Sequence, residues 1–219
     1  MTWSLGEIEA LSRKAARGSG LSWGLAEEAG RAARWLCAAG LPGADCLASL
    51  LQRNDGAAYE TLCPAETDGP WAAAGGTLCP LITGAALSDR AAELAAGQDI
   101  TLARTAFPLL LYPYMAGAAD ETGAALSLGW PGARLTRANG TTFLDQHGDD
   151  SVLCTVEAEN IPVGPALRNA RGRAVPRAWR GQITPETAGI LQGFAHRIHA
   201  PDTPESRLSG AGAGLTDND

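Results

Sequence analysis

The sequence predicts an α+β fold with N-terminal helices, a small central mixed sheet with packed helices, and a C-terminal helix followed by a glycine-rich tail. The first quarter of the chain repeats apolar residues at helical spacing. After Gly123 the pattern changes to short runs that are typical of strands and are separated by turn signals. Near the end, a Thr-Pro-Glu sequence at 184–186 opens one more helix.

The first helix is expected from Ser4 to Arg17, with apolar residues on one side and most charged residues on the other. Ser4 is expected to be its N-cap, and Glu7 three residues later completes a capping box. The Gly-Ser-Gly sequence at 18–20 ends this helix.

Two further helices are expected before residue 54. The first runs from about Trp23 to Ala39, with Ser22 as N-cap and Gly40 as a C-terminal stop. The second is short and covers about 44–53.

The middle of the chain is expected to hold little regular structure. Residues 54–98 are rich in Gly, Ala and Pro, which predicts loop with one short helix at about 87–96. Two similar Leu-Cys-Pro tripeptides, at 62–64 and 78–80, lie in this part with no repeat around them. A strand at 100–102 and a helix over 107–122 follow; Pro108 suits a helix start, and Pro113 would kink or interrupt the helix.

The sheet is expected from three runs at 124–130, 133–137 and 152–158. Trp-Pro-Gly at 130–132 and Asn-Gly at 139–140 are turn signals between such runs. Pro162 and Pro165 are expected to end the sheet. A last helix then runs to about His199, with Thr184 as N-cap and Pro185 at the first helical position.

The length of 219 residues predicts a single domain, 1–219, with a helical part at about 1–53, a mixed α/β part at about 77–200 and the tail at 201–219. Five cysteines form an odd set without Cys-x-x-Cys spacing, so we interpret them as reduced thiols that mostly serve packing.

The charge and hydropathy patterns exclude several classes of protein. The net charge of −7 opposes a nucleic-acid partner, which needs clustered Lys and Arg. No run approaches the roughly 18 apolar residues that a membrane helix needs. The N-terminus shows no basic segment followed by an apolar one, so a cytoplasmic location is expected.

One candidate binding site lies on the second helix. Glu27 and Arg31 are four residues apart and share a face near Trp23. The Arg31 guanidinium would hold a substrate carboxylate and the Glu27 carboxylate would act as a base. The alternative interpretation is a solvated ion pair, which is routine at this spacing.

The second candidate is the tail, where alternating glycines allow the backbone N–H groups to converge on an anion. The residues assigned to this anion site are Ser206, Arg207, Gly210, Gly212 and Gly214. The alternative is a frayed chain end.

No catalytic residue, cofactor or metal site is assigned from the sequence. His196 and His199 lie three residues apart on the last helix, close enough to share a metal, but no third ligand accompanies them. Electrostatic stabilisation of the helix end is the other interpretation of this pair.

Two segments, Ser4 to Gly30 and Ser206 to Asp219, resemble an uncharacterised bacterial family, a domain of unknown function numbered 3726. The most distinctive stretches are Ser-Trp-Gly-Leu-Ala-Glu-Glu-Ala-Gly at 22–30 and the glycine-rich tail. The resemblance implies that the tail is a feature of the family. It implies no activity.

Two functions follow as hypotheses. In the first, the chain is an enzyme or binding protein of intermediary metabolism that takes a small anionic metabolite, and the tail closes a pocket against the face from Trp23 to Trp35. In the second, the chain is a non-catalytic accessory subunit whose apolar segment from Phe107 to Met115 docks with the tail onto a partner enzyme.

Overall fold

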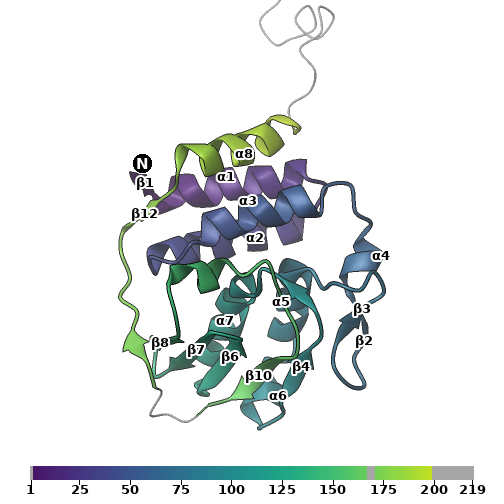
Figure 1. Ribbon diagram of the computed structural model, residues 1–219, viewed down its shortest axis with the longest axis vertical. Helices are drawn as coiled ribbons and strands as arrows, with labels where there is room; N and C mark the ends of the chain where they lie inside the picture. Colours follow the sequence, from purple (N-terminus) through teal and green to yellow (C-terminus); the bar gives the residue numbers. More distant parts are fainter. Residues whose placement is uncertain (1, 167–170, 199–219) are drawn as a thin grey trace, which may run out of the picture.

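A computed structural model describes residues 2–166 and 171–198. Helices near the two ends of the chain form one layer, and a sheet with its own helices forms a second layer beneath it (Figure 1). The expected α+β class is confirmed. None of the helices described is both long and apolar enough to cross a bilayer.

Eight α-helices and two 3-10 helices are described in these residues. They are α1 Leu5–Gly18, α2 Trp23–Ala38, α3 Gly43–Arg53, α4 Tyr59–Leu62, α5 Pro80–Ser88, α6 Ala91–Ala95, η1 Pro108–Leu111, α7 Tyr112–Thr122, η2 Asp150–Cys154 and α8 Pro185–His196. The strands are β1 Thr2–Ser4, β2 Pro64–Glu66, β3 Ala72–Ala73, β4 Ile100–Leu102, β5 Thr105–Ala106, β6 Leu126–Trp130, β7 Ala133–Ala138, β8 Thr141–Gln146, β9 Glu157–Ala158, β10 Ile161–Pro165, β11 Arg173–Ala174 and β12 Arg180–Gln182.

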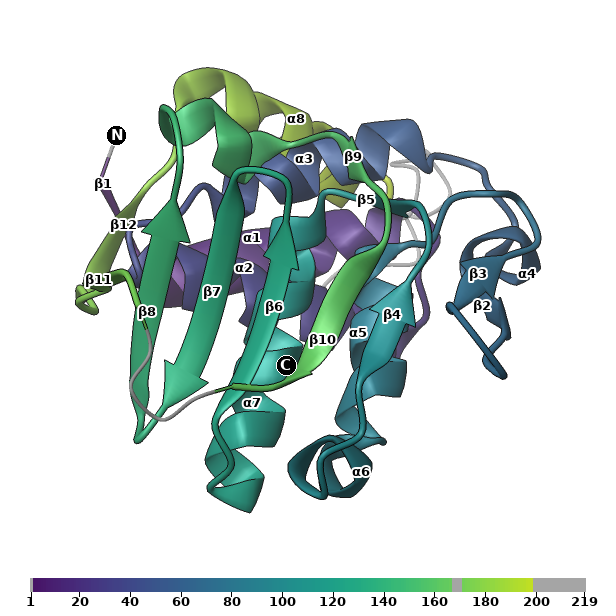
Figure 2. The same ribbon diagram turned by 60° about the horizontal axis from the view of Figure 1, so that its bottom comes forward.

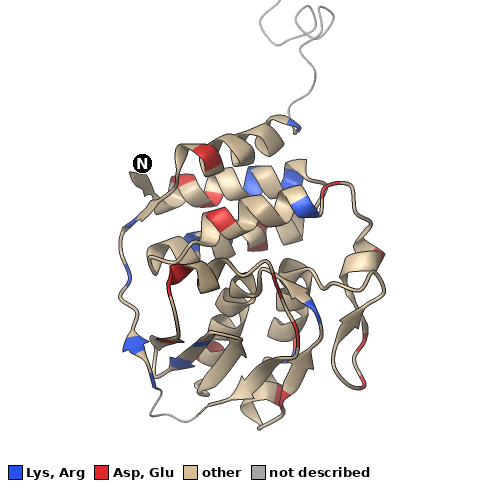
Figure 3. Cartoon of the chain, viewed as in Figure 1, with Lys and Arg blue, Asp and Glu red and all other residues tan. Residues whose placement is uncertain are grey.

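The N-terminal helices confirm the boundaries expected from local capping signals. The backbone N–H of Ser4 donates to Oε2 of Glu7 at 2.8 Å, and the N–H of Glu7 donates to Oγ of Ser4 at 3.2 Å, which completes the capping box of α1. Oγ of Ser22 accepts from the N–H of Leu25 at the start of α2. Acidic residues lie toward the N-terminal end of α1 and basic ones toward its C-terminal end, which complements the helix dipole (Figure 3).

Replacing Ser4 with alanine is expected to lower the free energy of unfolding by about 1 kcal/mol at neutral pH. The hydrogen bonds from Ser4 lower the pKa of Glu7, so part of this stability is present above the ordinary pKa of 4.5 and is lost as the pH falls through the folded value. Urea unfolding at about pH 7 and about pH 3 should therefore show a smaller wild-type-to-variant difference in acid.

Ser22→Ala is the matched control, because Ser22 caps α2 without a carboxylate partner at the third helical position. Its loss of stability should be similar at neutral pH and should not shrink in acid. If the loss of unfolding free energy depended on pH in the same way in both variants, the Glu7 carboxylate would not contribute to the stability of the α1 cap.

For residues 54–98 the sequence predicts loop with one helix at 87–96, and this prediction is wrong for the second half of the segment. The chain forms α5 at 80–88 and a separate α6 at 91–95, with the break at Asp89 and Arg90. Helix α5 is buried on most sides, so its sequence lacks the alternation of apolar and polar faces that reveals a surface helix. Pro80 at its first position is the remaining local signal.

The expected helix at 107–122 is confirmed with a change of type where the prolines lie. Pro108 opens the 3-10 turn η1, and Pro113 falls in the first turn of α7 instead of interrupting it. Gly123, at φ 68°, ends α7 in the left-handed region.

The main sheet has six strands in the order β11-β8-β7-β6-β10-β4 (Figure 2). A mixed sheet was expected, but all five pairings of these strands are antiparallel. Among the residues described, the parallel pairing at this sheet is one isolated bridge, between Trp71 and Leu102 at the β4 edge. The face that carries Leu128, Leu135 and Leu144 packs toward the helices, which lie behind the sheet in Figure 2.

The sheet does not end at Pro162, which lies inside strand β10, whereas Pro165 is the last residue of that strand. The strand pairs with β4 from Ile161 to Val163 and with β6 from Val163 to Pro165. Each proline is therefore paired with a neighbouring strand on one side only. No strand is paired with it on its other side, so the missing N–H costs no ladder hydrogen bond there.

The strand expected at 152–158 is also wrong. The 3-10 helix η2 covers 150–154, and only Glu157 and Ala158 are extended, as the short strand β9. The carboxylate of Asp149 accepts from the N–H of Ser151 and caps η2. The strand that follows the Asn-Gly turn is β8, at 141–146, which the sequence analysis did not assign.

Candidate functional site

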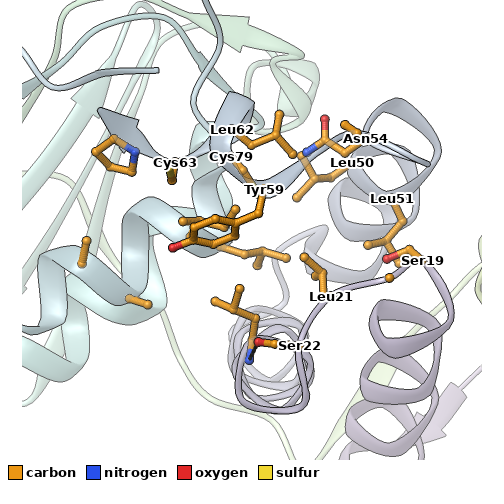
Figure 4. A pocket seen from close by; sticks show the side chains of 18 of the residues that line it. Ser19, Leu21, Ser22, Leu50, Leu51, Asn54, Tyr59, Leu62, Cys63 and Cys79 are labelled. Carbon is orange, nitrogen blue, oxygen red and sulfur yellow. Dashed lines mark hydrogen bonds between the residues drawn. The ribbon is translucent and has the colours of Figure 1, made fainter. Parts of the chain in front are cut away.

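A pocket of about 950 Å³ opens beside the helical layer, where the α1–α2 turn, the end of α3, α4 and one side of α5 meet. Its walls are mainly apolar, from Leu21, Leu25, Leu50, Leu51, Leu62, Trp71, Leu81, Ile82, Ala85 and Ala86. Figure 4 shows the Tyr59 ring in the middle of this group, with Leu21 and Ser22 on one side and Leu62 and Cys63 on the other.

The α1–α2 turn places Leu21 and Ser22 at the pocket. Gly20, at φ 101°, allows the chain to reverse, and the N–H of Leu21 donates back to the carbonyl of Ala16. The guanidinium of Arg17 donates to the carbonyl of Leu21 at 2.8 Å and lies 5.0 Å from the centre of the Trp23 ring. The turn is therefore held at both ends.

A second set of backbone contacts joins α4 to α5. The N–H of Cys79 donates to the carbonyl of Leu62 at 3.0 Å, and the N–H of Gly75 donates to the carbonyl of Thr61 at 2.9 Å. A Cβ on Gly75 would lie within 3.3 Å of the carbonyl carbon of Thr61, so the close approach requires glycine. These contacts bring the two Leu-Cys-Pro tripeptides of the sequence together at one pocket.

Trp71 forms one wall and is fixed to the edge of the sheet. Its N–H donates to the carbonyl of Thr101 at 2.8 Å, and its carbonyl accepts from the N–H of Ala103 at 2.9 Å. The side chain is 5% exposed. The pocket therefore has a rigid wall that continues the β4 edge.

The thiol of Cys79 lies at the buried side of the pocket, at the N-terminus of α5. Burial raises the pKa of this thiol, and hydrogen bonds from the N–H groups of Ile82 and Leu81 and from the Asn54 side chain act in the opposite direction. The thiol of Cys63 donates to the carbonyl of Glu60 at 3.7 Å. Both thiols are described as free.

The charged groups lie at the rim. Arg90 donates to both carboxylate oxygens of Glu93, at 3.0 and 2.8 Å, and both side chains of this pair are more than 40% exposed. Asp89, which is exposed, also lines the pocket beside Arg90. The pocket thus combines an apolar interior with a polar edge, an arrangement that is common in sites for small organic molecules.

These groups support binding more directly than catalysis. A cysteine nucleophile needs a base or another means of lowering its pKa, and the residues that line the pocket in the described part of the chain include no histidine. In the same part, no three His, Cys, Asp or Glu side chains are grouped as a metal ion would require.

The structure places Trp23, Glu27 and Arg31 on an exposed face of α2, next to the pocket. Arg31 pairs with Glu28 at 2.6 Å and with Glu27 at 3.6 Å, and its side chain is 60% exposed. Trp23 is 65% exposed. Their neighbours Ser22 and Leu25 line the pocket, whereas these three side chains are not among its described lining residues.

The tail residues assigned to an anion site, Ser206, Arg207, Gly210, Gly212 and Gly214, lie outside the described residues. His199 lies outside them as well, so its spacing from His196 stays a property of the sequence. The segment from Phe107 to Met115, offered as a docking surface, is buried apart from half-buried Pro113. Its apolar residues fill the core between the sheet and the helices, which corrects that assignment.

Sequence analysis did not find the pocket because its walls come from separate segments between residues 19 and 90. The repeated Leu-Cys-Pro tripeptide was the one local signal at this place. In each copy the proline begins a regular element, β2 after Cys63 and α5 after Cys79. That role explains the similarity without a sequence repeat.

Residues 3–79 match the model of a family described as "Protein of unknown function (DUF3726)". The match confirms the resemblance noted for the segment from Ser4 to Gly30, so this N-terminal part of the chain is similar to that family. The tail segment on which the resemblance also rests lies beyond the matched residues. No curated protein and no solved structure matches the chain.

Proposed function

We propose that the chain, whose residues 3–79 match the model of the family of unknown function DUF3726, binds a small organic molecule with an apolar body and an anionic end. The observation that carries the proposal is the pocket of about 950 Å³ with leucine-rich walls and a polar rim. Pockets for small molecules and cofactors generally have volumes of roughly 300–1,000 Å³, with mostly apolar walls and a few polar groups.

The apolar body of the ligand would lie against Leu21, Leu50 and Leu62, the side chains that come from three different segments of the wall. Burial of such a body releases about 25 cal/mol for each Å² of apolar surface removed from water. The rigid attachment of Trp71 to the β4 edge limits the reorganisation that binding would require.

Arg90 is the rim cation that supports an anionic end. Its present partner, Glu93, is three residues away and both side chains are partly exposed, so the pair is worth little in free energy and a ligand carboxylate can replace Glu93. A guanidinium binds a carboxylate with two parallel hydrogen bonds, which favours a carboxylate over a hydroxyl group.

The first test is a thermal shift of the full chain with octanoate, dodecanoate and hexadecanoate, each beside the alcohol of the same length. A ligand at 100 times its Kd stabilises by about 2.7 kcal/mol, which raises Tm by about 5–10 °C for a chain of this size. The carboxylates should give the larger shift, and Arg90→Gln should reduce the difference between carboxylate and alcohol.

Ala86→Trp is expected to weaken binding of the best carboxylate at least about tenfold, because an indole ring at this wall of α5 occupies the volume of the ligand. The measurement is a titration followed by tryptophan fluorescence or calorimetry. Ala92→Trp is the matched control, since Ala92 is an exposed residue of α6 outside the described pocket lining and its replacement should leave Kd unchanged.

Two results would overturn the proposal. One is the absence of a thermal shift with any of the carboxylates and alcohols. The other is a shift of equal size in wild type, Ala86→Trp and Ala92→Trp, because the ligand would then bind elsewhere on the chain.

The assignment of Trp23, Glu27 and Arg31 to the binding site is a separate proposal, and the same titration tests it. If Arg31 holds the anionic end, Arg31→Ala weakens binding of the carboxylate and leaves that of the alcohol unchanged. If Arg90 holds it, Arg31→Ala has no effect. Arg90 lines the pocket and Arg31 is not among its described lining residues, which favours the second outcome.

A further inference from the structure

Two cysteines that are far apart in the sequence meet between the helical layer and the end of the sheet. Cys46 lies in α3, and Cys154 is the last residue of η2. The thiol of Cys46 donates to the carbonyl oxygen of Leu153 at 3.6 Å, and Cys154 is the next residue along the chain. The Cys46 thiol therefore lies against the backbone next to Cys154, and the two thiols influence each other's pKa.

Three contacts hold η2 in this place. The Leu153 side chain is 3% exposed and belongs to the core. Nε1 of Trp130, at the end of β6, donates to the carbonyl of Val152 at 3.0 Å. The hydroxyl of Thr155 donates to the same carbonyl at 2.7 Å. The position of Cys154 beside α3 follows from this anchoring and does not depend on the cysteine itself.

The two thiols have opposite environments. Cys46 is 1% exposed, whereas Cys154 is exposed to solvent. The nearby Cys46 thiol lowers the pKa of Cys154, against the opposing effects of partial burial and of the Asp45 and Asp150 carboxylates. The interaction with Cys154, together with burial, raises the pKa of Cys46. One thiol is thus accessible and the other is a buried proton donor.

We propose that Cys46 and Cys154 form a reversible disulfide site that is oxidised by hydroperoxides. The Cys154 thiolate attacks one oxygen of the peroxide, the O–O bond breaks, and the second oxygen leaves as water or an alcohol after taking a proton. Cys154 becomes a sulfenic acid. The Cys46 sulfur then attacks the Cys154 sulfur, the S–O bond breaks, and water leaves with the Cys46 proton, so two thiols lose two electrons to one peroxide.

The other cysteines differ from Cys154 in access. Burial raises the pKa of Cys37 to about 11, and Cys79 is 2% exposed. Cys63 is half-buried and its thiol donates to a backbone carbonyl. Reaction with a peroxide depends on an accessible thiolate, so the reaction should start at Cys154.

The test exposes the reduced full chain to small excesses of hydrogen peroxide and follows its intact mass and its non-reduced peptide map. The expected result is a mass loss equal to two hydrogen atoms and a peptide pair that joins Cys46 to Cys154. Dithiothreitol should reverse both changes. The oxidised form should have a Tm higher by about 5 °C or more, because the bond closes a long loop.

Cys154→Ser should abolish the mass loss, and Cys63→Ser is the control that should retain it. Cys46→Ser should leave a sulfenic acid at Cys154 that dimedone captures, with circular dichroism used to check that this buried substitution preserves the fold. The wild-type peptide map tests the proposal even if Cys46→Ser does not fold.

The proposal is overturned if peroxide converts Cys154 to sulfinic acid while Cys46 remains open to alkylation in the denatured protein. It is also overturned if the peptide map shows a disulfide between other cysteines, or if Cys154→Ser loses two hydrogen atoms as readily as wild type.

Discussion

Gly18→Ala is expected to lower the free energy of unfolding by about 3 kcal/mol. Gly18 is the last residue of α1, where α8 crosses it. A Cβ at this position would overlap the carbonyl oxygen of Phe194 and lie 2.7 Å from its carbonyl carbon. Backbone atoms cannot rotate away as a side chain does, so α1 and α8 must separate and lose part of their shared core.

Gly6→Ala provides the control on the same helix, because a Cβ at Gly6 would meet nothing within 4 Å. Its expected effect is a gain of about 0.5 kcal/mol, since alanine is the better helix former. Urea unfolding followed by circular dichroism measures both variants. Similar unfolding free energies for the two would show that α8 does not need this close contact.

Asp120→Ala is expected to cost about 2–3 kcal/mol, the second large effect. Arg137 of β7 donates to both carboxylate oxygens of Asp120 in α7, at 2.8 Å each. The Arg137 side chain is only 9% exposed, so removal of the carboxylate leaves a buried cation with Thr142, at 3.2 Å, as its remaining described hydrogen-bond partner. The estimate is below that for a fully buried pair because the Asp120 side chain is 45% exposed.

Glu159→Ala is the matched control, because it removes a carboxylate that also accepts two hydrogen bonds from one arginine, Arg104. Both of these side chains are more than half exposed, so water replaces the lost partner and stability should hardly change. Thermal unfolding of the two variants beside wild type makes the comparison. An equal loss in both would mean that the Arg137 pair gains nothing from burial.

Helix α3 connects the two proposals made for this chain. Cys46 lies in its first half, and Leu50, Leu51 and Asn54 at its end form part of the pocket wall. A disulfide to η2 would fix the first half of this helix relative to the sheet. The two proposals remain separable, because ligand titration of Cys154→Ser reports on the pocket without the dithiol.

Local chemistry in the sequence determined the helix starts of the α-helical layer. Ser4, Ser22 and Thr184 each accept a hydrogen bond from an N–H within the next three residues, so the whole signal lies in a few consecutive residues. The same holds for the Asn-Gly turn at 139–140, where both residues have positive φ and join β7 to β8. Such features can be predicted because no distant partner is needed to satisfy them.

Only the tertiary structure decided helix α5 and strand β10. Helix α5 shows no polar face because other elements cover most of it, and β10 tolerates Pro162 and Pro165 because its two neighbours overlap only at Val163. Neither arrangement leaves a periodic alternation of apolar and polar residues along the chain. Such an alternation arises where one face of an element is buried and the opposite face meets water.

The candidate sites show the same division. The sequence by itself determined that an amphipathic helix starts within residues 22–30, a segment inside the 3–79 match to the family model, and it indicated Trp23 and Arg31 as candidates. The pocket and the Cys46–Cys154 pair arise where segments far apart in the chain pack together. Those contacts depend on how the layers close over one core, and no local spacing of residues encodes them.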